Sequence, residues 1–191
     1  MKKLSTRELI SCSLFTAIIA VGAFIQIPVP GMDYFTLQFL FVLMAGMILG
    51  SHKGAISVAV YVLLGLIGIP IFAAGGGITY IFRPSFGYLL AFIVAAFITG
   101  LISEKNKENS LKRYLLAAIA GFVVTYIIGL TYKYFMLNFY VGEKTALFMV
   151  IADCFPIDMP GDILLTILSA ILAKRLVPAL SKINKRNKGG N

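Results

Sequence analysis

GLIGIPIFAAGGGITYIFRPSFGY, residues 65–88, is the stretch on which the expected fold depends. It starts inside one long apolar segment and ends inside another, and it places three glycines at 75–77, then Arg83 and Pro84, between them. Ordering glycine is entropically costly and proline ends or kinks helices, so irregular backbone is predicted between two membrane-length helices. Such backbone, and an arginine costing about 3 kcal/mol among lipid, is tolerated where protein covers it or it lines a cavity. We interpret the stretch as a loop that closes over a binding cavity; the alternative is a short, flexible outer turn.

The composition is that of an integral membrane protein. Of the 191 residues, 59% are hydrophobic and 13% are charged, whereas a soluble domain has about 25% charged residues. No polar run is long enough to fold alone, so we expect one membrane domain over 1–180 and a basic cytoplasmic tail over 181–191. Cys12 and Cys154 are expected at opposite membrane faces, with no disulfide between them and no metal motif. The single histidine, His52, lies in a short polar loop and is assigned no role.

Six apolar segments predict an all-α bundle of six transmembrane helices. They cover residues 8–27, 35–50, 54–72, 84–102, 114–137 and 157–180. A signal peptide would also fit the first segment, but the further spans that follow it favour a helix that stays in the protein. Of the 17 Lys and Arg residues, only Arg83, Lys133 and Lys144 fall on the side away from the termini, so the positive-inside rule places both termini in the cytoplasm. This distribution argues for a membrane partner rather than nucleic acid, despite the net charge of +9.

The candidate polar site lies at the outer ends of the predicted spans. Asp158 and Asp162 are four residues apart and would share a helix face, where a carboxylate could accept hydrogen bonds from ligand N–H groups; the alternative is that both only cap the helix. Arg83 could bind a ligand carboxylate, or could instead pair with these aspartates or lie at the headgroup level. Lys133 is expected to extend toward the outer interface. The expected substrate-binding residues are Gln38, Gly75, Gly76, Thr79, Tyr80, Arg83, Tyr88, Asp158 and Asp162, with Phe72 and Phe86 as further apolar wall candidates.

The sequence does not favour an enzyme. It contains no phosphate-binding loop for ATP hydrolysis, no HExxH and no CxxC, and no recognisable nucleophile–base pair. An intramembrane enzyme with scattered catalytic residues is the less favoured alternative. Small residues one turn apart in the first segment, Ser13, Ala17 and Ala20, would let another membrane protein approach closely, or would pack within this chain.

Six motifs in this order resemble the BioY family, the biotin-specific substrate-binding (S) components of energy-coupling factor (ECF) transporters. They are IPVP at 27–30, TLQ at 36–38, GLIGIPIFAAGGG at 65–77, RPSFGYLLAF at 83–92, and PGD at 160–162 followed by AKRL at 173–176. The likeness extends from about residue 10 to residue 177. The combined set is far more specific than any one of these motifs.

The resemblance implies a six-helix bundle in the prokaryotic plasma membrane, with an outward-facing vitamin site covered by the loops after spans one, three and five. It implies high-affinity capture of biotin, no cofactor, and uptake with a transmembrane coupling protein and two cytoplasmic ATPases. Ser13 and Ala17 stand where the family has its coupling alanines. Many relatives have a lysine where this chain has Leu165, so we hypothesise that Arg83 supplies that cation while Asp158 or Asp162 meets the ureido N–H groups. The alternative ligands are other carboxylate-bearing vitamins, such as lipoate or dethiobiotin.

Overall fold

The chain folds as a bundle of helices with one small hairpin. The computed structural model describes residues 5–28, 34–105, 109–154 and 158–186. Within them lie seven α-helices, two paired antiparallel strands, a 3₁₀ helix and a π-helical turn. In chain order they are α1 (Thr6–Phe24), β1 (Gln26–Pro28), β2 (Tyr34–Thr36), α2 (Gln38–Leu49), α3 (Ser51–Leu66), the 3₁₀ helix Ile78–Phe82, α4 (Phe86–Lys105), α5 (Leu111–Phe135), the π-helical turn Met136–Val141, α6 (Leu147–Cys154) and α7 (Asp158–Arg186).

Four of these helices are long and apolar enough to cross a membrane. They are α1, α4, α5 with its π-helical extension to Val141, and α7 as far as Ser181. The helices α2 and α3 are also apolar but have 12 and 16 residues, which gives them lengths of about 18 and 24 Å. A helical membrane protein is therefore confirmed, and the count of six spans stays a prediction.

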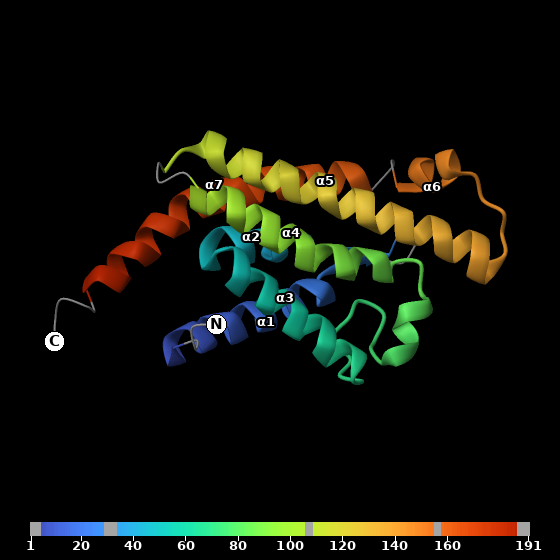
Figure 1. Cartoon of the computed structure of the whole chain (residues 1–191), viewed down its shortest axis with the longest axis horizontal. Helices are drawn as coiled ribbons and strands as arrows, with labels where there is room; N and C mark the ends of the chain where they lie inside the picture. Colours follow the sequence, from blue (N-terminus) through green and yellow to red (C-terminus); the bar gives the residue numbers. More distant parts are fainter. Residues whose placement is uncertain (1–4, 29–33, 106–108, 155–157, 187–191) are drawn as a thin grey trace.

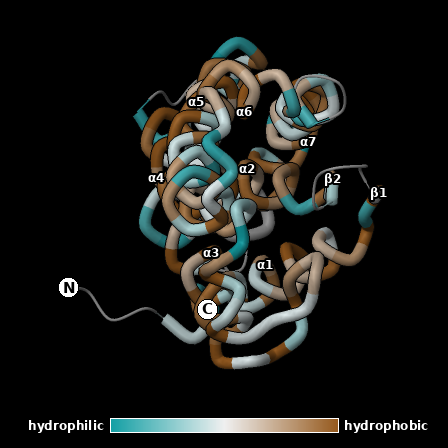
Figure 2. The backbone as a smooth tube through the Cα atoms, turned by 90° about the vertical axis from the view of Figure 1, so that its right-hand side faces the viewer, coloured by the Kyte–Doolittle hydropathy of each residue, from teal (hydrophilic) through white to brown (hydrophobic). Residues whose placement is uncertain are grey.

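The most buried helix is α2. It packs against α1, α3, α4 and α7, and most of its side chains are buried. Figure 2 shows it between α1 and α3 on one side and α4, α5 and α7 on the other. A helix with neighbours on every face needs apolar residues on every face, which explains the uninterrupted sequence QFLFVLMAGMIL.

The first helix is attached to α3 by polar contacts along one seam. Ser5 caps α1 by accepting the Glu8 N–H, while the Glu8 carboxylate accepts from the Ser5 N–H, a reciprocal capping box. Glu8 also pairs with Lys53 of α3 at 2.6 Å. Further along, the Thr16 hydroxyl donates to the Ser57 carbonyl at 2.9 Å. The opposite face of α1, which includes Leu14 and Val21, is exposed.

The structure corrects two predicted helix boundaries. The third segment is helical only to Leu66, because Gly68 has a φ of +110° and Pro70 follows, so residues 67–72 leave the helix. The second segment starts as a strand, and its helix begins at Gln38. The last helix continues to Arg186, its apolar part ends at Ser181, and residues 187–191 lie outside the described part, so the basic tail over 181–191 stays a prediction.

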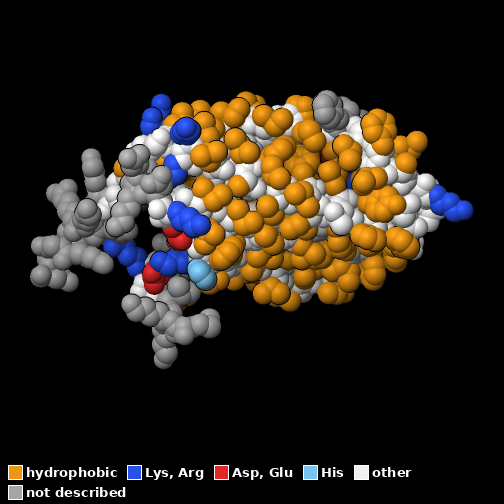
Figure 3. Space-filling model, turned by 45° about the horizontal axis from the view of Figure 1, so that its top comes forward, with side chains coloured by type: hydrophobic (Ala, Val, Ile, Leu, Met, Phe, Trp, Pro, Cys, Tyr) orange, Lys and Arg blue, Asp and Glu red, His pale blue; other side chains and the backbone are white. Residues whose placement is uncertain are grey.

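The two ends of the bundle differ in charge. Figure 1 shows that α1 begins and α7 ends at the same end of the molecule. Figure 3 shows Lys and Arg side chains gathered at this end, next to a broad apolar surface. We call it the basic end, and we call the opposite end, which carries the hairpin, the 3₁₀ helix and α6, the loop end. The apolar surface is what a protein surrounded by lipid requires.

Candidate functional site

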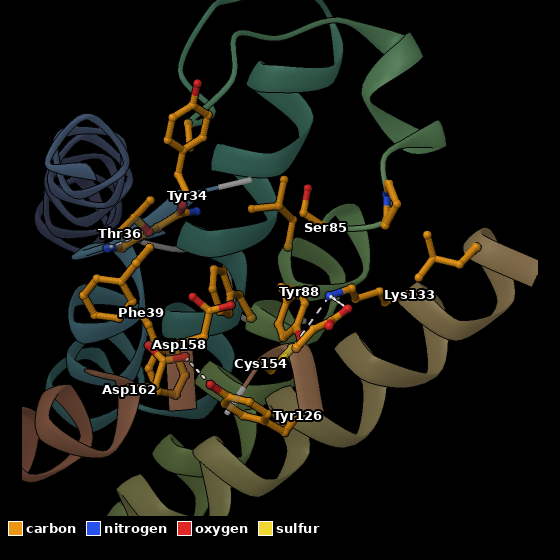
Figure 4. A pocket seen from close by; sticks show the side chains of 18 of the residues that line it. Tyr34, Thr36, Phe39, Ser85, Tyr88, Tyr126, Lys133, Cys154, Asp158 and Asp162 are labelled. Carbon is orange, nitrogen blue, oxygen red and sulfur yellow. Dashed lines mark hydrogen bonds and ion pairs between the residues drawn. The ribbon is translucent and has the colours of Figure 1, made fainter. Parts of the chain in front are cut away.

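A cavity of about 430 Å³ opens at the loop end. This volume is within the range of about 300–1,000 Å³ that is usual for small-molecule sites. The cavity has aromatic and apolar walls interrupted by polar groups from β2, α2, α4, α5, α6, α7 and the connecting loops (Figure 4). The lining residues are Tyr34, Phe35, Thr36, Gln38, Phe39, Ala73, Tyr80, Pro84, Ser85, Tyr88, Leu89, Phe92, Tyr126, Lys133, Leu137, Glu143, Thr145, Asp153, Cys154, Asp158 and Asp162.

Two carboxylates stand on one wall of the cavity. α7 begins at Asp158, so Asp158 and Asp162 are one turn apart and both line the cavity. The Tyr126 hydroxyl of α5 donates to Asp162 Oδ2 at 2.9 Å. An ionised carboxylate has about four acceptor positions, so this one bond leaves Asp162 able to accept from a ligand.

Gln38 contributes a polar group at the first residue of α2. The residue is 3% exposed, its side chain lies next to the Tyr61 hydroxyl, and its Nε2 makes no well-aligned hydrogen bond among the described residues. A buried N–H group without a partner is costly by about 1–3 kcal/mol, and a ligand oxygen would remove that cost. The adjacent wall is aromatic, with Phe39 stacked on Phe92 at 5.7 Å between ring centroids.

A second polar group lies where α4, α5 and α6 meet. The Lys133 ammonium lies 3.9 Å from Asp153 Oδ2 and 3.9 Å from Cys154 Sγ, and the Cys154 thiol is 3.4 Å from the Tyr88 hydroxyl. Burial raises the pKa of the Cys154 thiol, so it is neutral near pH 7. Asn138 fastens the loop before α6 to the end of α5 by donating to the carbonyls of Tyr134 and Thr145.

The glycine-rich loop between α3 and the 3₁₀ helix is folded against the end of α3. Phe72 and Gly75 exchange backbone hydrogen bonds, and the Gly77 N–H donates to the Gly65 carbonyl at 2.7 Å, which folds the loop back onto α3. Gly75 and Gly77 both have a φ of +106°, a conformation that favours glycine. Between residues 73 and 83, Ala73 and Tyr80 are the residues that line the cavity.

The expected binding residues are divided by the structure into two groups. Gln38, Tyr80, Tyr88, Asp158 and Asp162 line the cavity together. Gly75, Gly76, Thr79 and Arg83 are not among its lining residues, and their contact with a ligand stays a prediction.

Several residues singled out in the sequence lie outside the cavity wall and contact other parts of the chain. The Arg83 guanidinium lies over the Tyr80 ring, 5.3 Å from its centroid. Phe72 and Phe86 belong to the hydrophobic core rather than to the cavity wall. Leu165 is a core residue too, with 4% exposure. On α1, Ser13 and Ala17 are exposed and Ala20 is half-buried.

Sequence reasoning missed Tyr126 as a site residue and assigned Lys133 only to the membrane interface. The two are seven residues apart on α5, which places them on one face of the helix, two turns apart. That spacing was a usable signal, but it does not say whether the face is turned toward the protein or toward lipid.

Comparison with known proteins agrees with the sequence motifs. A sequence model of the BioY family matches residues 1–182. The chain is 40% identical over 176 residues to a probable biotin transporter BioY of Lysinibacillus sphaericus, which covers 92% of this chain and 89% of the relative. It is 44% identical over 138 residues to the biotin transporter BioY of Thermotoga maritima, which covers 72% of this chain and 78% of the relative.

A solved structure shows the same fold. The crystal structure of the S-component for biotin from an ECF-type ABC transporter superposes with a TM-score of 0.76, over 91% of this chain and 94% of that one, at 24% identity. With a family match over nearly the whole chain and relatives of this similarity, the chain belongs to the BioY family.

Proposed function

We propose that this protein binds biotin at the loop end and is the substrate-binding component of an ATP-driven ECF transporter, not an enzyme. The observation that carries this proposal is the convergence of Gln38, Tyr126 and Asp162 on one aromatic-walled cavity. Biotin is a bicyclic urea with an acid arm, so it needs an acceptor for its N–H groups, a donor for its urea oxygen and apolar walls. Asp162 is the acceptor and the Gln38 amide is the donor. The names of the relatives support the same ligand.

The proposed topology follows from charge. The basic end lies in the cytoplasm of a prokaryotic cell and the loop end faces outward across the plasma membrane, in agreement with the positive-inside rule. In this arrangement α2 and α3 complete six membrane passages within the bundle.

The proposed partner surface is the exposed face of α1. Ser13 and Ala17 are small and exposed there, so another helix could approach the α1 backbone closely. We propose that the coupling protein binds at this face and that two cytoplasmic ATPases supply the energy.

Uptake of radiolabelled biotin tests the proposal in bacterial cells that lack biotin uptake of their own. Cells with this chain, the coupling protein and both ATPases are expected to accumulate biotin in an ATP-dependent way, and excess lipoate is expected not to compete. Ala17→Trp is expected to reduce uptake while the purified variant still binds biotin. The matched control is Val123→Trp, at a 46% exposed position on α5. Uptake that is unaffected by Ala17→Trp, or that lipoate abolishes, would contradict the proposal.

A further inference from the structure

Lys133 is the one basic side chain that lines the cavity in the part of the chain that the structure describes. Four carboxylic acids also line the wall, namely Glu143, Asp153, Asp158 and Asp162. A ligand that carries a carboxylate is repelled by these groups, and the repulsion is stronger inside a protein than in water. The position of Lys133 therefore decides where such a carboxylate can lie.

Two acids of the same wall, Asp153 and Asp158, lie near Lys133, and among the described residues only Asp153 is within ion-pair distance of its ammonium. The Lys133 side chain is 12% exposed, so water reaches it poorly. Its ion pair with Asp153 has an N–O distance of 3.9 Å, whereas a close ammonium–carboxylate hydrogen bond is about 2.7–2.9 Å long. The Asp153 side chain is itself 55% exposed and can turn toward solvent. A largely buried ammonium gains most from an anion that can approach more closely.

The cavity has two chemically different ends along α5. Tyr126, which donates to Asp162, lies two helical turns from Lys133 on the same face, a separation of about 10 Å along the helix axis. Figure 4 shows Asp162 and Lys133 on opposite sides of the labelled side chains, with Tyr88 between them in this view. Acceptors for N–H groups therefore gather at one end and the cation lies at the other.

We propose that Lys133 binds the carboxylate of the ligand and thereby fixes the direction in which the ligand lies, with its ring at Asp162 and its acid arm toward α6. This inference rests on the proposed function. The ligand carboxylate replaces Asp153 as the nearest anion of Lys133. Lys133 then makes the protein prefer a ligand with a free carboxylate over the corresponding amide or ester. The contacts of the ligand ring with Asp162 are the same for all three.

Paired binding measurements test this assignment in detergent-purified protein. Titration calorimetry compares biotin with biotin amide, which has the same ring and arm but no charge. The wild-type chain is expected to prefer biotin by about 10- to 100-fold, the size of one charge-assisted hydrogen bond. Lys133→Met is expected to weaken biotin binding by that factor and to leave amide binding within about threefold. Lys133→Arg keeps the charge and is expected to keep the preference.

Lys144→Met is the matched control. It removes a positive charge from an exposed position of the same outer region, outside the cavity, and is expected to leave the preference unchanged. The assignment would be overturned if Lys133→Met weakened the binding of biotin and of biotin amide equally, including loss of both. It would also be overturned if Lys133→Met kept the full preference for biotin over biotin amide. A wild-type chain that bound neither compound would overturn the proposed function and this inference with it.

Discussion

Asp162→Asn is the substitution that most sharply tests the acceptor wall of the cavity. The Asp162 carboxylate accepts one hydrogen bond from Tyr126 at 2.9 Å, and its remaining lone pairs are available to ligand N–H groups. Asparagine has nearly the same shape, but it replaces one oxygen by an NH₂ group that cannot accept. A hydrogen bond to a charged group contributes about 1.5–3 kcal/mol, so the affinity for biotin is expected to fall about 10- to 150-fold.

The companion variant Tyr126→Phe distinguishes the contribution of the Asp162 carboxylate from that of the hydroxyl that donates to it. It removes the hydroxyl donor and leaves the Asp162 oxygens in place for the ligand, so the loss is expected to be smaller, about 2- to 13-fold, because only the support of the carboxylate is lost and not its own bonds to the ligand. Both values come from equilibrium dialysis with radiolabelled biotin on purified protein, with thermal unfolding as the check on folding. Two results would contradict the role given to Asp162: an Asp162→Asn variant that binds biotin within twofold of wild type, or one that loses less affinity than Tyr126→Phe does.

Three further predictions concern the scaffold and the closure of the site. Gly65→Ala is expected to lower stability by about 1–3 kcal/mol in thermal unfolding, because the added Cβ would overlap the buried Phe72 ring; an unchanged midpoint would contradict this. Thr16→Val removes the hydrogen bond to the Ser57 carbonyl between α1 and α3, so the free energy of unfolding is expected to fall by about 0.6 kcal/mol while the biotin affinity is unchanged. A fall well above about 1.7 kcal/mol would mean that the substitution disrupts more than this one hydrogen bond. In a Cys12→Ala background, maleimide is expected to modify Cys154 slowly at pH 7, and the rate is expected to rise about tenfold per pH unit up to the raised pKa of the thiol. Bound biotin is expected to slow the modification further. Equal rates with and without biotin would show that the ligand does not lie against this wall.

The class of the protein and part of its site could be predicted from the sequence for simple reasons. Long apolar segments must be helices in lipid, because no water is there to satisfy their backbone groups. Asp158 and Asp162 could be paired in advance, because a four-residue spacing places two side chains on one helix face wherever that helix lies. Both do line the cavity.

The remaining residues depended on contacts that no local pattern encodes. Arg83 directly precedes Pro84 in the loop, and its direction depends on the turn that follows the 3₁₀ helix, which places it over Tyr80. Lys133 is surrounded by apolar and aromatic neighbours in the sequence, and only the packing of α5 against α4 and α6 shows that its ammonium reaches the cavity. Helix faces are readable from spacing, but which face meets the cavity is decided by tertiary packing.

Equilibrium binding of biotin to the detergent-purified chain alone is the decisive measurement of biotin binding at the loop end, because it requires neither the proposed coupling protein nor the ATPases. We expect saturable binding of one biotin per chain, with a dissociation constant below about 1 µM, which is about −8 kcal/mol. Absence of binding at biotin concentrations up to about 1 mM, in protein shown to be folded, would contradict it.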